Sequence, residues 1–126
     1  MELPVPGILE SPFGVFESKI FSYKKQKIEE KKYTKWFDYD KIKNSPCVRT
    51  RRQGDYLTVN SEGGRKKLNR IFIDEKIPAE MRDRLPVVAV GSEILWIPGG
   101  RMNEKYKITS TTGRVLELHY QGGALA

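Results

Sequence analysis

Residues 63–72, GGRKKLNRIF, mark the point at which a strand-rich sequence takes on helical spacing. The apolar residues recur at intervals of three and four, which predicts the buried face of a helix: Leu68, Ile71 and Phe72. The cations fall off that face: Arg65, Lys66, Lys67 and Arg70. Because two glycines precede the cations, three interpretations are open: a nucleotide-binding loop, a nucleic-acid-binding helix, or the solvated face of an ordinary helix.

Spacing excludes the nucleotide-binding loop. A P-loop ends in Gly-Lys followed by Ser or Thr, and it carries an earlier glycine at a fixed distance. Here the glycines are followed by Arg65, and Lys67 is followed by Leu68. No Gly-x-Gly-x-x-Gly pattern occurs anywhere in the chain. Two interpretations of the stretch therefore remain.

Short alternating runs bounded by glycine and proline predict strands through most of the remaining chain. Residues 1–12 fit an extended segment or edge strand, and 24–35 a charged loop. Strands are expected at 13–23, 35–39, 48–52, 55–59, 87–90, 93–97, 105–109 and 114–120. A second short helix is expected from Pro78 to Arg84. The prediction is a strand-rich α+β fold, with 1–46 as a linker segment with short strands, 47–121 as the main domain and 122–126 as a tail.

Composition favours a polyanionic partner. The 126 residues include 23 Lys and Arg against 16 Asp and Glu, a net charge of +7, which suits nucleic acid or an acidic membrane surface. The lone Cys47 and the lone His119 provide no internal disulfide, no zinc site and no nucleophile with a base nearby in sequence. No apolar run is long enough to span a membrane, which indicates a cytoplasmic protein.

A second group of cations lies upstream of the glycines, in VRTRRQGDY (48–56). On a strand, Arg49 and Arg51 would share one face and Arg52 would lie on the other. The planar fork of arginine suits phosphate, so this strand and the following helix are expected to form a clamp for a sugar-phosphate backbone. Asp55 is expected to cap the turn or to pair with an arginine rather than to act in catalysis.

Four blocks of the chain, in this order, resemble the C-terminal domain of the bacterial tRNA(Ile)-lysidine synthetases: RTRRQGD (49–55), GGRKKLNRIFIDEKIP (63–78), RDRLP (82–86) and ILWIPGGRMNEKYKI (94–108). Each block alone is a weak signal, but their order is specific. Two positions depart from the family pattern: Arg65 stands where many members have serine, and Gln53 where proline is frequent.

The resemblance implies an ATP-dependent ligase that attaches lysine to the wobble cytidine of isoleucine tRNA. In that family the chemistry lies in an N-terminal adenylating domain with a Ser-Gly-Gly-x-Asp-Ser loop, which does not occur in this sequence. The chain is therefore expected to be the C-terminal part alone, with no catalytic residue and no cofactor or metal of its own; ATP and magnesium would act in the parent protein. The resemblance also implies a small three-layer fold with a β-sandwich and one or two short helices, like a domain in the β subunit of phenylalanyl-tRNA synthetase.

In this family the C-terminal domain grips the acceptor-stem side of the tRNA. The resemblance therefore assigns tRNA contact to nine cations: Arg49, Arg51, Arg52, Arg65, Lys66, Lys67, Arg70, Arg101 and Lys105. The expected partners are isoleucine tRNA and the adenylating domain. The alternative is a domain-packing or dimerisation module, with a second copy as partner, whose basic patch is incidental.

Overall fold

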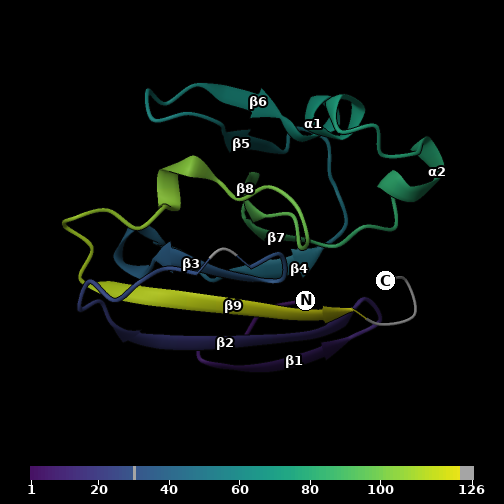
Figure 1. The fold of residues 1–126 in the computed structure, drawn as a ribbon. Helices are drawn as coiled ribbons and strands as arrows, with labels where there is room; N and C mark the ends of the chain where they lie inside the picture. Colours follow the sequence, from purple (N-terminus) through teal and green to yellow (C-terminus); the bar gives the residue numbers. More distant parts are fainter. Residues whose placement is uncertain (30, 123–126) are drawn as a thin grey trace.

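The structure is a computed structural model that describes residues 1–29 and 31–122 (Figure 1). Two β-sheets and a few short helices make up this part of the chain. Apart from Gly122, the predicted tail lies outside the described residues. No helix among the described residues is long and apolar enough to cross a membrane.

The first sheet joins the two ends of the chain. In spatial order its strands are β1 (Gly7–Ser11), β2 (Gly14–Ser22), β9 (Arg114–Gly122) and β3 (Thr34–Asp38), all antiparallel to their neighbours. Phe16 of β2 lies opposite Tyr120 of β9, and Ser18 lies opposite Leu118. Phe16 and Ser18 are buried, so the alternation predicted for this strand is confirmed.

The second sheet is built from the middle of the chain. Its spatial order is β4 (Cys47–Arg49), β7 (Val87–Val90), β8 (Glu93–Trp96), β5 (Tyr56–Thr58) and β6 (Arg65–Lys67). The β5–β8 pair is parallel, and the other pairs are antiparallel. The sheet therefore ends at β6, whose outer edge has no strand beside it among the described residues.

Two α-helices and two 3-10 helices complete the fold: α1 (Leu68–Asp74), α2 (Ala79–Arg82), η1 (Tyr39–Lys41) and η2 (Glu104–Tyr106). Figure 1 shows the α-helices at one end of the molecule, beside β6, and the β1–β2–β9–β3 sheet at the other, with β8, β7 and β4 of the second sheet between them. This arrangement confirms the strand-rich, three-layer fold with a β-sandwich and short helices.

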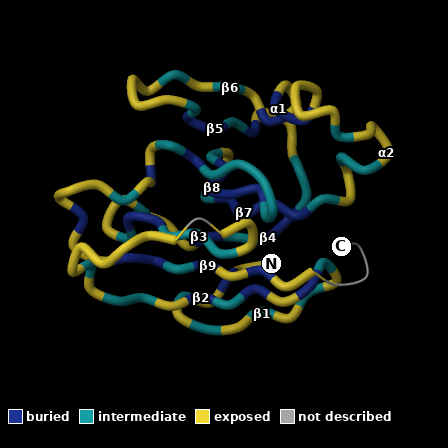
Figure 2. The backbone as a smooth tube through the Cα atoms, in the orientation of Figure 1, coloured by how far each residue is buried: buried dark blue, intermediate teal, exposed yellow. Residues whose placement is uncertain are grey.

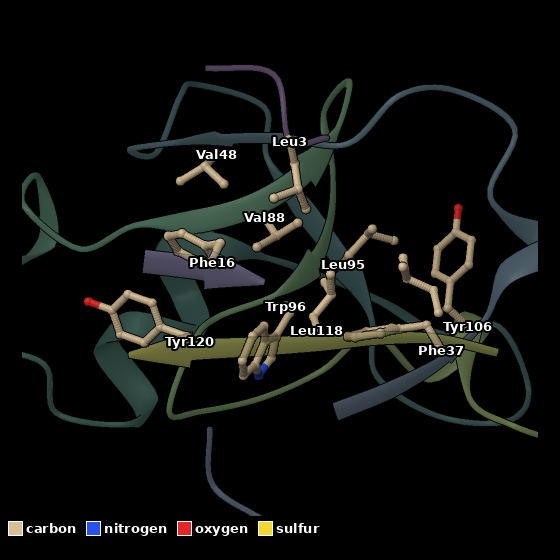
Figure 3. Close-up of a cluster of buried hydrophobic side chains, with 11 residues drawn as sticks. Leu3, Phe16, Phe37, Val48, Val88, Leu95, Trp96, Tyr106, Leu118 and Tyr120 are labelled. Carbon is tan, nitrogen blue, oxygen red and sulfur yellow. The ribbon is translucent and has the colours of Figure 1, made fainter. Parts of the chain in front are cut away.

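Two hydrophobic clusters hold the three layers together. The first lies between the sheets and includes Phe16, Phe37, Val88, Trp96 and Leu118 (Figure 3). The second lies between the middle sheet and α1, and its members come from both: Leu57, Leu68, Ile71, Phe72, Val87, Ala89, Ile94 and Ile97. Buried backbone is accordingly concentrated in the middle strands, while the loops are exposed (Figure 2). The predicted apolar face of the helix is thus confirmed.

Residues 1–46, expected to be a linker segment with short strands, supply β1, β2 and β3 and pack into the first cluster. Phe16 and Phe37 are fully buried there. The N-terminus also lies beside β4, because Leu3 N donates to Pro46 O at 2.9 Å and Val48 N donates to Met1 O at 2.7 Å. This segment therefore forms one folded body with residues 47–122.

Three local predictions are wrong. The strand predicted at 48–52 ends at Arg49, because the chain turns at Arg52 to Asp55, where Asp55 N donates to Arg52 O at 3.2 Å. Arg65, Lys66 and Lys67, expected on the helix off its apolar face, instead pair with β5 as strand β6, and α1 begins only at Leu68. The strand predicted at 105–109 is replaced by η2, whose first turn is capped by the side chain of Asn103.

The packing of α1 predicts a large contrast between two neighbouring residues. Phe72 is fully buried, whereas Ile73 is 48% exposed. Phe72→Ala is expected to lower the free energy of unfolding by about 3–5 kcal/mol, because it leaves a cavity against the middle sheet. Ile73→Ala is the matched control, with an expected change below about 1 kcal/mol. Urea unfolding of both variants measures the difference, and equal losses would contradict the packing described here.

Candidate nucleic-acid interface

Arg49 is a buried structural residue rather than an exposed cation. Its side chain is 8% exposed, and its guanidinium donates to both carboxylate oxygens of Asp55 at 2.8 Å. The same guanidinium donates to the carbonyls of Thr50 at 2.9 Å and Gly91 at 2.8 Å. The hydrogen bond to Asp55 raises the pKa of Arg49, so its guanidinium stays charged although it is buried. Its guanidinium is therefore not presented to a ligand.

Asp55 takes the structural role predicted for it. Besides Arg49, its carboxylate accepts a hydrogen bond from Arg52 N at 2.7 Å, which closes the turn. Its backbone carbonyl accepts from Leu68 N, the first residue of α1, at 2.9 Å. Both predicted roles, turn cap and arginine partner, are confirmed in one residue.

Arg51 lies on the helix side of the molecule, away from Arg49. Its Nε donates to Asp83 Oδ1 at 2.8 Å, and its Nη1 donates to Asn69 Oδ1 at 3.0 Å. The Arg51 guanidinium lowers the pKa of Asp83 through this hydrogen bond. The prediction that Arg49 and Arg51 share a face is wrong, because β4 ends between them.

Lys66 and Arg70 converge on one carboxylate. Lys66 comes from β6, Arg70 from α1, and both pair with Asp74 at the end of α1, the Arg70 contact measuring 3.3 Å. Lys66 lies opposite Leu57, whose side chain is buried against α1, so the helix-facing side of β6 carries this cation. The hydrogen bond from Lys66 lowers the pKa of Asp74.

Arg65 and Lys67 point to the other side of β6. Lys67 lies directly opposite Tyr56, and Arg65 lies opposite Thr58. The Arg65 guanidinium stacks over the Tyr56 ring, 4.7 Å from its centroid, which fixes the side chain without neutralising it. Both cations are exposed, and neither has a carboxylate partner among the described residues.

The remaining predicted cations differ in their surroundings. Arg52 is exposed and has no carboxylate partner in the described part of the chain. Arg101 is half-buried and donates to Val59 O at 3.4 Å. Lys105, on η2, lies 3.6 Å from Glu93 Oε2.

The glycines of residues 63 and 64 shape the β5–β6 hairpin. Gly63 has a φ of +85°, and a Cβ on Gly64 would lie 2.6 Å from the Asn60 side chain. That side chain accepts hydrogen bonds from Gly64 N at 2.9 Å and from Glu62 N at 3.0 Å. The nucleic-acid-binding helix considered for residues 63–72 therefore does not begin at these glycines, because strand β6 separates them from α1.

The structure thus divides the nine predicted cations. Arg51, Lys66 and Arg70 lie on the helix side, while Arg65 and Lys67 lie on the opposite side of the same edge strand. Sequence periodicity missed a group on that opposite side: Lys41, Lys43, Tyr56, Glu93 and Tyr106 line one cavity together with Lys105. Among the described residues, no three His, Cys, Asp or Glu side chains gather as metal ligands would.

Comparison with known families gives a match over most of this region. Residues 47–118 match the family described as the TilS substrate C-terminal domain. A crystal structure of a TilS C-terminal domain superposes with a TM-score of 0.79 at 34% sequence identity, covering 96% of this chain and 94% of that one. The likeness therefore includes the strands contributed by residues 1–46.

Curated relatives named tRNA(Ile)-lysidine synthase are similar over most of the chain. The protein from Caldanaerobacter subterraneus subsp. tengcongensis is 41% identical over 120 residues, which is 94% of this chain and 26% of that protein. The protein from Geobacillus kaustophilus is 37% identical over 123 residues, 95% of this chain and 26% of that protein. The chain thus spans about a quarter of the length of these relatives.

The buried pair predicts that Arg49 and Arg51 differ sharply in their effect on stability. Arg49→Ala leaves Asp55 buried without its partner, so the free energy of unfolding should fall by about 3–5 kcal/mol. Arg51→Ala breaks an exposed pair and should cost about 1 kcal/mol or less. Chemical denaturation compares the two variants, and similar losses would show that the Arg49–Asp55 pair does not hold this part of the fold.

The ion pair between Arg51 and Asp83 predicts that the pKa of Asp83 depends on Arg51. The pKa of Asp83 is lowered in the folded state. The pair therefore stabilises the fold at pH values above the ordinary pKa of Asp, and this stabilisation is lost as the pH falls through the lowered pKa of Asp83. Arg51→Gln should raise the pKa of Asp83 towards its ordinary value, as measured by carboxyl NMR titration. Arg52→Gln is the control and should leave that pKa unchanged.

Proposed function

The chain belongs to the family of TilS substrate C-terminal domains, and on that premise we propose that it binds tRNA and positions it for a catalytic domain outside residues 1–126. The proposed substrate is isoleucine tRNA, gripped on its acceptor-stem side. ATP- and magnesium-dependent transfer of lysine belongs, in this proposal, to the remainder of the parent ligase. The chain itself supplies binding and orientation.

The cations around β6 are the observation that carries the proposal. Lys66 faces α1 whereas Arg65 and Lys67 face the opposite side, so one edge strand presents positive charge in both directions. Arg70 adds charge from α1, and Arg52 from the turn after β4. Only some of this charge is neutralised. On the helix side, Asp74 pairs with Lys66 and Arg70, and Asp83 pairs with Arg51.

An edge strand with this pattern suits a duplex backbone. Exposed Lys and Arg side chains replace the counterions of phosphates, which supplies affinity without base recognition. A backbone lying along the outer edge of β6 would reach cations on both sides of the sheet. Arg49 is left out of this surface because its guanidinium is buried, and Arg101 and Lys105 lie at its margin.

Salt dependence of binding tests the proposal. The double variant Arg52→Gln with Lys67→Gln removes two exposed cations that have no carboxylate partner in the described chain, so the fold should be unaffected. The affinity for isoleucine tRNA should fall, and the slope of log affinity against log salt should flatten by about one unit for each phosphate that the variant no longer neutralises.

The matched control is Lys19→Gln with Lys31→Gln, which removes the same charge from exposed sites outside the middle sheet. It should leave the salt slope near that of the unchanged chain. An unchanged slope in the Arg52 and Lys67 variant would overturn the assignment of this surface. A stable dimer that buries β6, detected by light scattering, would favour the dimerisation module instead.

A further inference from the structure

A cavity of about 250 Å³ lies on the side of the middle sheet opposite α1. Its walls include Lys41 and Lys43 from the segment around η1, Tyr56 from β5 and Lys105 from η2. These elements are far apart in sequence and meet because β5 lies beside β8 and contacts η2. The fold therefore gathers three lysines around one hollow.

The cavity has an excess of positive charge. Its three lysines face one carboxylate, Glu93. Two other cavities of the described chain are balanced: one is lined by Glu2 and Lys43, the other by two lysines and two glutamates. The excess is thus a property of this cavity rather than of every hollow in a basic protein.

Glu93 is already engaged within the protein. Its side chain is 12% exposed; Tyr106 donates its hydroxyl hydrogen to Oε1, and Lys105 lies 3.6 Å from Oε2. Burial raises the pKa of Tyr106, so its hydroxyl stays protonated and continues to donate. The Glu93 carboxylate is therefore already engaged by Tyr106 and Lys105, two other residues that line the cavity.

The lysines remain accessible to a ligand. The side chains of Lys41 and Lys105 are 43% and 52% exposed. Lys43 donates to the backbone carbonyl of Asp40 at 2.7 Å. Because a carbonyl group has no net charge, this bond does not neutralise the Lys43 ammonium group. Lys41 forms a long ion pair with Asp38, with Nζ and Oδ2 3.9 Å apart. Ammonium groups with several free donors bind phosphate oxygens as compact point charges.

Cations of β6 continue this positive region beyond the cavity. Tyr56 lines the cavity, Lys67 lies opposite Tyr56 in the ladder, and Arg65 stacks over the same ring. Residues directly opposite in an antiparallel pair share one sheet face. The face of β6 that turns away from α1 is therefore continuous with the lysine-lined cavity.

We propose that this cavity binds a phosphate group of the tRNA backbone, held by Lys41, Lys43 and Lys105. The inference rests on the proposed function and adds a specific site to it. At about 250 Å³, the cavity lies below the roughly 300–1,000 Å³ of pockets that enclose a whole small ligand. It thus fits one charged group presented by a larger molecule rather than a free nucleotide cofactor.

The test combines two measurements on Lys41→Gln with Lys43→Gln, a variant that leaves the Glu93 contacts intact. In the first, the salt slope of tRNA binding should flatten by about one unit relative to the unchanged chain. In the second, inorganic phosphate added at constant ionic strength should cause saturable NMR shifts at the amides of Ser92 and Lys105, and these shifts should be absent in the variant. Lys19→Gln with Lys31→Gln is again the control and should keep both signals.

The outcomes separate this inference from the proposed function. If the variant binds tRNA with an unchanged slope and phosphate causes no saturable shifts in the unchanged chain, the cavity site is overturned and salt-dependent tRNA binding by the unchanged chain stands. If phosphate saturates the cavity but the tRNA slope does not change, the site takes free phosphate and the inference about RNA is overturned. If the unchanged chain does not bind tRNA, the proposed function fails and the inference fails with it.

Discussion

The buried contact between Arg49 and Asp55 fixes the geometry on which the rest of the middle sheet depends. Arg49 ends β4 and also binds the carbonyl of Gly91, so one guanidinium connects the edge strand to the turn between β7 and β8. Asp55 in turn holds the first residue of α1 through its own carbonyl. Since two buried charges are stable only when both are paired, the strands, the turn and the helix start are held in one arrangement.

This arrangement determines where the exposed charge lies. The chain passes from β6 into α1 with no intervening loop, because Lys67 ends the strand and Leu68 begins the helix. A strand alternates its side chains between two faces, whereas a helix would have placed Arg65, Lys66 and Lys67 around one exposed arc. Positive charge consequently reaches both sides of the sheet edge, which gives the proposed RNA surface more breadth than one helix face could.

Sequence patterns predicted the layers better than the site. The alternation of β2 and the spacing of Leu68, Ile71 and Phe72 report burial directly, so both were correct. The failures occurred where a long-range partner decides the local structure. Arg49 is cationic in sequence but buried in the fold, and only the position of Asp55 after the turn hinted at its partner. The cavity could not be predicted, because its lysines meet only through the sheet order.

The tight turn between β5 and β6 has a consequence for how such a surface can change. Asn60 and the two glycines set the length of this hairpin and therefore its register. Because neighbouring side chains on a strand point in opposite directions, inserting one residue there would exchange the faces of the three cations. Loop length, rather than any change of charged residue, would then redistribute the positive potential across the sheet edge and alter which surface an incoming polyanion meets first.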